Sequence, residues 1–86
     1  MRARRKEGLT EIPGVGPAIA GKLHALGIRS VKGLKRKDPE RLYLKYSAIT
    51  GQKADRCLLY VFRAAVYYAS NDVRDPRLLK WWNWKD

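Results

Sequence analysis

The stretch LTEIPGVGPAIAGKLHALGI, from Leu9 to Ile28, decides the fold of this chain. At its centre two glycines flank one apolar residue, and a proline stands on each side, in the order Pro13, Gly14, Val15, Gly16 and Pro17. Both glycines can take a positive φ and allow another backbone to approach closely. Proline suits the first turn of a helix, where its missing N–H is not needed. The pattern predicts a tight hairpin between a short helix and a longer one.

The apolar residues around this hairpin recur at spacings of three and four. Such spacing places them on one buried helical face, which we expect to contain Ile12, Val15, Ile19, Leu23 and Leu26. Gly27 is expected to end the longer helix in the left-handed conformation.

The hairpin is also a candidate anion site. The backbone N–H groups from about Gly14 to Ala18 lack partners within a helix and lie at the positive end of a helix dipole. Phosphate is a common ligand of such a site. An ordinary Gly/Pro turn that only reverses the chain has the same sequence, so both interpretations stay open at this point.

The stretch resembles the helix-hairpin-helix motif of DNA repair, recombination and replication proteins. The matching residues are Ile12, Pro13, Gly14, Val15, Gly16, Ala20, Leu23, Gly27 and Ile28. The resemblance implies that the amides of Gly14, Val15, Gly16 and their neighbours hold a DNA phosphate without reading bases. Many DNA-binding members carry Lys or Arg where this chain has Ala18, and Lys22 is the nearest basic substitute.

Charge is concentrated on the half of the chain that contains the hairpin. The net charge is +11, and residues 1–37 contain ten Lys or Arg and two acids, a net of +8. A localised basic field favours a polyanionic partner such as DNA, although charge for solubility is the alternative. The supporting basic residues would be Arg29, Lys32, Lys35, Arg36 and Lys37, with Arg4 and Arg5 on an N-terminal arm.

The remaining sequence predicts helices only. Capping residues place helix starts at Ser30, Asp38-Pro39 and Asp75-Pro76, with one further helix from 52–54 to 70–71. We expect buried side chains at Leu42, Tyr46, Ile49, Cys57, Leu58, Val61, Phe62, Ala65, Val66 and Ala69. The 86 residues therefore predict an all-α fold, a small bundle of about five helices, with a basic arm at 1–8 and a single domain at 9–86.

Three tryptophans, Trp81, Trp82 and Trp84, lie within four residues near the C-terminus. Indole rings can stack on unpaired bases, or close the bottom of a small core, or form a patch for a partner protein or for self-association. A domain this small needs apolar surface, which favours the core.

Nothing in the sequence points to catalysis. One Cys and one His form no metal-ligand cluster, and the eight acids are scattered without a paired signature. We expect no cofactor, no metal and no small-molecule substrate. The apolar runs fall short of a membrane span and the N-terminus lacks a secretion signal, so a cytoplasmic location is expected.

The full chain resembles a small bacterial helix-hairpin-helix family known as pathogenicity locus or mitomycin-resistance proteins. Beyond the hairpin, the resemblance rests on Asp38-Pro-Glu, Ile49-Thr-Gly, Val61-Phe-Arg-Ala-Ala-Val-Tyr-Tyr and Trp81-Trp-Asn-Trp-Lys-Asp. The C-terminal domain of competence regulators is similar too. The resemblance implies association with DNA and a link to tolerance or repair of DNA damage.

Two functions follow as hypotheses. The first is a non-catalytic, sequence-independent DNA-binding module, for which RNA is a variant ligand. The second is a protein-interaction domain, for docking or dimerisation, that uses the surface at Ala18 and Ile19 or the Trp tail.

Overall fold

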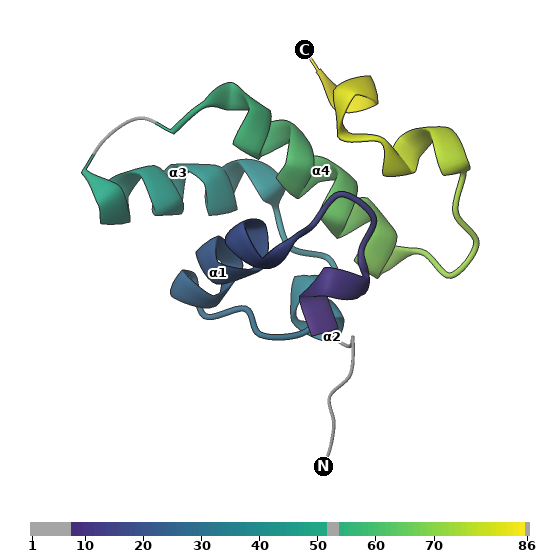
Figure 1. Ribbon diagram of the computed structural model, residues 1–86, viewed down its shortest axis with the longest axis horizontal. Helices are drawn as coiled ribbons and strands as arrows, with labels where there is room; N and C mark the ends of the chain where they lie inside the picture. The colour runs from purple at the N-terminus through teal and green to yellow at the C-terminus, as the bar shows by residue number, and fades with distance from the viewer. Residues whose placement is uncertain (1–7, 52–53, 86) are drawn as a thin grey trace.

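The computed structural model describes residues 8–51 and 54–85. Within these residues the chain is helical and contains no strand (Figure 1). The α-helices are α1 (Pro17–Ala25), α2 (Val31–Leu34), α3 (Pro39–Thr50) and α4 (Arg56–Ser70), and the 3₁₀ turns are η1 (Gly8–Glu11), η2 (Pro76–Leu79) and η3 (Trp81–Trp84). The predicted all-α fold is confirmed. Most of the predicted basic arm, with Arg4 and Arg5, lies outside the described residues.

The local sequence signals explain where the helices begin and end. The Ser30 hydroxyl accepts a hydrogen bond from the Gly33 amide, and the Asp38 carboxylate accepts from the amides of the next turn. Gly27 and Gly51 follow α1 and α3 with φ of +87° and +77°, the left-handed conformation that glycine adopts at low cost. The two 3₁₀ turns η2 and η3 replace the single final helix that the sequence predicts.

Helix α4 forms the centre of the molecule. It packs against α3, α2, η2 and η3 (Figure 1), and Phe62 on it is fully buried. The hairpin segment crosses α4 as well, since the Tyr68 hydroxyl of α4 donates a hydrogen bond of 3.0 Å to the Glu11 carboxylate of η1. The core contains Leu9, Ile12, Val15, Ala20, Leu23, Leu26, Ile28, Leu34, Leu42, Tyr43, Leu58, Leu59, Phe62, Ala65 and Val66.

Two expected core residues, Ile49 and Cys57, are exposed in the structure, and Tyr43, which was not expected in the core, is buried. Ile49 is 55% exposed, because α3 turns Leu42 and Tyr43 toward the core and Ile49 lies in its last turn. Tyr43 is buried, and its hydroxyl donates to the Ala54 carbonyl across the α3–α4 connection. Cys57 is exposed, because it lies in the first turn of α4, one residue before the buried Leu58. Val61 and Ala69 are half-buried and pack against the edge of the core.

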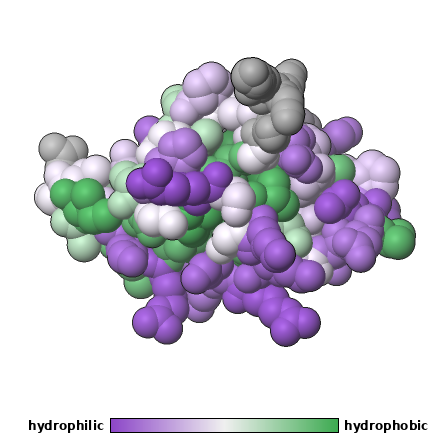
Figure 2. Space-filling view, turned by 90° about the horizontal axis from the view of Figure 1, so that it is seen from below, coloured by the Kyte–Doolittle hydropathy of each residue, from purple (hydrophilic) through white to green (hydrophobic). Residues whose placement is uncertain are grey.

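The surface divides into hydrophilic and hydrophobic areas. Figure 2 shows one face, on which hydrophilic side chains gather along the lower edge and hydrophobic ones are visible in the middle. None of the helices in residues 8–51 and 54–85 combines the length with the apolar character that a membrane crossing requires.

Candidate nucleic-acid interface

The hairpin before α1 is a type II β-turn. The Val15 amide donates a hydrogen bond of 3.0 Å to the Ile12 carbonyl, and Gly14 has a φ of +86°. A type II turn favours proline at its second position and requires a positive φ at its third, which are Pro13 and Gly14 here. The sequence therefore determines this turn locally.

Helix α1 begins directly after the turn with open backbone donors. Gly16 is the N-cap residue and offers no side chain, so the first turn has no side-chain cap. The first bond of the helix runs from the Ala20 amide to the Gly16 carbonyl at 2.9 Å. Within the described part of the chain, the structure shows no hydrogen bond from the amides of Gly16, Ala18 or Ile19. These donors lie at the positive end of the α1 dipole.

The structure differs from the predicted phosphate site at two residues, Val15 and Gly16. The Val15 amide is not an open donor, because the turn itself uses it, and the Val15 side chain is buried in the core. Gly16 does not take a positive φ: its φ is −94° in extended backbone, and a Cβ built there meets no atom within 4 Å. Of the two hairpin glycines, only Gly14 needs the conformational freedom of glycine, while Gly16, which has no side chain to act as a cap, leaves the first amides of α1 open.

Lys22 does not extend toward the first turn of α1. It is half-buried, and its ammonium lies over the Tyr46 ring of α3, 5.6 Å from the ring centroid. This cation–π contact joins α1 to α3. Arg29, Lys32 and Lys35 are exposed, and Arg29 lines a cavity of about 490 Å³ with residues of η1 and α1.

Two of the predicted basic residues, Arg36 and Lys37, line a cavity of about 580 Å³ together with Arg41 and Lys45 of α3. Arg41 and Lys45 were not among the predicted basic residues. Their spacing of four residues, which places both on one helical face directly after the Lys-Arg-Lys run, is a signal that could have identified them.

The three tryptophans have three different environments. Trp84 packs against Tyr67 with ring centroids 5.8 Å apart, and its indole N–H donates to the Leu78 carbonyl at 2.7 Å. Trp81 lies against the hairpin, with its Cδ1 4.0 Å from the position of a Cβ on Gly14. Trp82 is 51% exposed and meets Trp81 edge-on. The tail therefore supports α4 and the hairpin and leaves one indole exposed.

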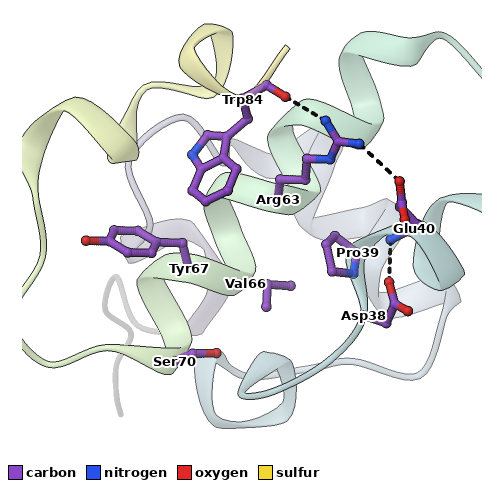
Figure 3. A pocket seen from close by; sticks show the side chains of 8 residues that line it. All are labelled: Asp38, Pro39, Glu40, Arg63, Val66, Tyr67, Ser70 and Trp84. Atoms are coloured by element: carbon purple, nitrogen blue, oxygen red, sulfur yellow. Dashed lines mark hydrogen bonds and ion pairs between the residues drawn. The ribbon is translucent and has the colours of Figure 1, made fainter. Parts of the chain in front are cut away.

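A second cavity, of about 490 Å³, separates the start of α3 from the tail (Figure 3). Arg63 spans it, donating to the Trp84 carbonyl at 2.7 Å and to the Glu40 carboxylate at 3.1 Å. These contacts tie the tail to α4 and α3. Because Arg63 and Glu40 already bind each other and Arg63 binds the tail, these contacts explain the charged groups at this cavity without a ligand.

In residues 8–51 and 54–85, no group of three His, Cys, Asp or Glu side chains could hold a metal ion. Desolvation raises the pKa of the Cys57 thiol, and a hydrogen bond from the thiol to Asp55 raises it further, which disfavours the reactive thiolate.

Comparison with known proteins identifies relatives. The family model described as "Cdd1: Pathogenicity locus" matches residues 2–86. The chain is also 34% identical over 76 residues to "Mitomycin resistance protein McrB" of Streptomyces lavendulae, a match that covers 88% of this chain and 69% of that protein. No solved structure matches the chain.

Proposed function

Since this chain belongs to the Cdd1 pathogenicity-locus family, we propose that it is a non-catalytic DNA-binding module that grips backbone phosphate and does not read sequence. The observation that carries the proposal is the open first turn of α1 behind the hairpin. The amides of Gly16, Ala18 and Ile19 would bind the phosphate, and the nearby basic side chains would add attraction at longer range.

The start of α1 differs from the other helix starts. Among the four α-helices of the described residues, α1 alone begins without a side-chain cap, since Ser30, Asp38 and Asp55 cap α2, α3 and α4. An uncapped first turn leaves N–H groups that need a partner, either water or an anion. A glycine at the N-cap also lets a bulky phosphate approach the backbone.

The relative from Streptomyces lavendulae is named a mitomycin resistance protein. A DNA-binding module that contributes to DNA damage tolerance or repair in the cytoplasm is consistent with that name. Contacts to phosphate alone would let the module act on damage in any sequence context. The names of the family and the relative do not indicate catalysis.

The decisive experiment compares Gly16→Asp with Gly16→Ala. Both side chains fit, because no atom lies within 4 Å of a Cβ at Gly16 and its φ is negative. Aspartate would cap α1 with its own carboxylate, as Asp38 caps α3, and would occupy the amides. Alanine leaves the amides open and is the matched control.

We expect the wild-type protein to bind duplex DNA with a Kd in the micromolar range or weaker at physiological salt. The log–log salt slope should be about −3. Gly16→Asp should weaken binding by about tenfold or more, since hydrogen bonds to a charged group contribute about 1.5–3 kcal/mol. Gly16→Ala should stay close to wild type, and fluorescence anisotropy with a labelled duplex measures all three.

Equal affinity of Gly16→Asp and Gly16→Ala would show that phosphate is not bound at the hairpin. Absence of binding by the wild type even at low salt would end the DNA hypothesis. Thermal melts of both variants establish that each is folded, so a loss of binding can be assigned to the site.

A protein-docking function is the second candidate, favoured by the exposed indole of Trp82, which meets Trp81 edge-on, and by exposed Ala18. A mass that rises with protein concentration, in a protein that does not respond to DNA, would support docking or dimerisation. Trp82→Ala should then restore a constant mass.

A further inference from the structure

The turn between α2 and α3 and the first turns of α3 enclose a basic cavity. It is the cavity of about 580 Å³ described above, lined by Arg36, Lys37, Asp38, Arg41, Leu42 and Lys45. Four of these side chains are cationic and one is anionic. Two cations come from the turn and two from one face of α3, so the positive charge converges from two elements.

The single carboxylate in the cavity is already engaged. Asp38 accepts hydrogen bonds from the amides of Glu40 at 2.9 Å and Arg41 at 3.4 Å, which turns the carboxylate toward the α3 backbone. Within residues 8–51 and 54–85, the structure shows no ion pair for the side chains of Arg36, Lys37, Arg41 or Lys45. Other arginines differ: Arg63 pairs with Glu40, and Arg77 pairs with Asp75.

Arg36 is held in place by its backbone. Its φ is +63°, the left-handed region that a side-chain-bearing residue occupies at a cost of about 1–2 kcal/mol. Its amide donates a hydrogen bond of 3.0 Å to the Ser70 hydroxyl at the end of α4. Glycine would occupy this position without strain. The presence of arginine therefore places a cation at the cavity at some expense of stability.

We propose that this cavity binds a second backbone phosphate of the DNA that the hairpin holds, which rests on the proposed function. Arginine donates paired hydrogen bonds to phosphate, and lysine adds a point charge. Arg41 and Lys45 lie one helical turn apart on the same face and can approach one phosphate together. The Lys22–Tyr46 contact links the helix that carries the hairpin to the helix that carries these cations. Two anchored phosphates would fix the path of the DNA backbone across the protein without selecting its sequence.

The test uses three charge-removing variants of the full chain. Arg41→Gln removes a cation from the cavity, and Arg36→Gly removes another while relieving the strained φ, so the fold should be kept. Arg77→Gln is the matched control, because it removes one positive charge at an exposed ion pair in η2. Each variant is titrated with a labelled DNA duplex and with an RNA duplex at several salt concentrations, and its folding is checked by thermal melting.

We expect Arg41→Gln and Arg36→Gly each to weaken DNA binding and to reduce the log–log salt slope by about 1. Arg77→Gln should leave the slope close to that of the wild type. If the cavity variants change binding no more than Arg77→Gln does while Gly16→Asp still weakens it by about tenfold or more, the cavity is not a phosphate site and the hairpin function stands. If the wild type does not bind DNA at any salt concentration, both proposals fail. Tighter binding of the RNA duplex, with the same variants impaired, would overturn DNA as the ligand.

Discussion

The turn before α1 and the turn before α3 share one backbone geometry and differ in chemistry. In each, the amide that closes the turn donates a hydrogen bond of 3.0 Å to the carbonyl of a buried aliphatic residue, Ile12 in the first turn and Leu34 in the second. In each, the third residue has a positive φ, +86° at Gly14 and +63° at Arg36. Both are type II turns.

The residues that follow the two turns also correspond. In both, the turn is followed by an N-cap residue and then by a proline that opens the helix, Gly16-Pro17 before α1 and Asp38-Pro39 before α3. The first cap leaves the helix amides open, whereas the second fills them with its own carboxylate. One backbone geometry thus precedes two different helix starts: open amides at α1, and a self-capped helix beside cationic side chains at α3.

Truncating the buried first residue of each turn should have the largest effect on stability. Ile12 and Leu34 are 1% and 0% exposed, so Ile12→Ala and Leu34→Ala should each lower the free energy of unfolding by about 2–5 kcal/mol. Chemical denaturation followed by tryptophan fluorescence measures both. Leu44→Ala, at an exposed position of α3, is the control and should change stability by less than about 0.5 kcal/mol. A neutral Leu34→Ala would show that only the first turn is anchored in the core.

Substitutions at the third position of each turn should change stability less, and in opposite directions. Gly14→Ala forces a side chain into the left-handed region and should cost about 1–2 kcal/mol. Arg36→Gly relieves the same strain, and after the added freedom of glycine in the unfolded state it should stabilise the protein by about 0.5–1 kcal/mol. Thermal and chemical unfolding report both changes. Loss of stability in Arg36→Gly would mean that the arginine side chain supports the fold, and the strain argument would then be wrong.

Sequence reasoning predicted the first turn and missed the second for a physical reason. Pro-Gly in the middle of a turn leaves little choice of geometry, so residues 12–15 are determined locally. Lys35-Arg36 carries no such signal. Its geometry depends on the burial of Leu34, on the cap at Asp38 and on the Ser70 hydroxyl, which is distant in sequence.

The short reach of local sequence signals also explains the other differences between the predicted and the observed structure. Helix caps such as Ser30 and Asp38 act within three residues, and they were predicted correctly. Which face of α3 meets the core depends on a rotation of about 100° per residue, and the apolar residues Leu42, Leu44 and Ile49 do not fix it. The contact of Trp81 with Gly14 joins the two ends of the domain, so no local pattern could indicate it.

A second Asp-Pro start, at Asp75-Pro76 before η2, is expected to have the smallest effect on stability, and it separates capping from charge pairing. Asp75 caps the Arg77 amide at 2.9 Å as Asp38 caps α3, but it also pairs with the Arg77 guanidinium at 2.8 Å. The hydrogen bond from the Arg77 side chain, with the Arg77 amide and the attraction between the charges, holds the pKa of Asp75 below its ordinary value. A carboxyl whose pKa is lower in the folded protein stabilises the fold at pH values above its ordinary pKa, and this contribution is lost as the pH falls through the folded-state pKa.

Asp75→Asn keeps the cap and removes the charge, so it should lower the melting temperature slightly at neutral pH and converge with the wild type in acid. Arg77→Gln should reproduce part of this pH dependence, and the double variant should add little to either single change. Equal melting temperatures of Asp75→Asn and wild type at every pH would assign the role of Asp75 to capping alone, which is the role of Asp38 at α3.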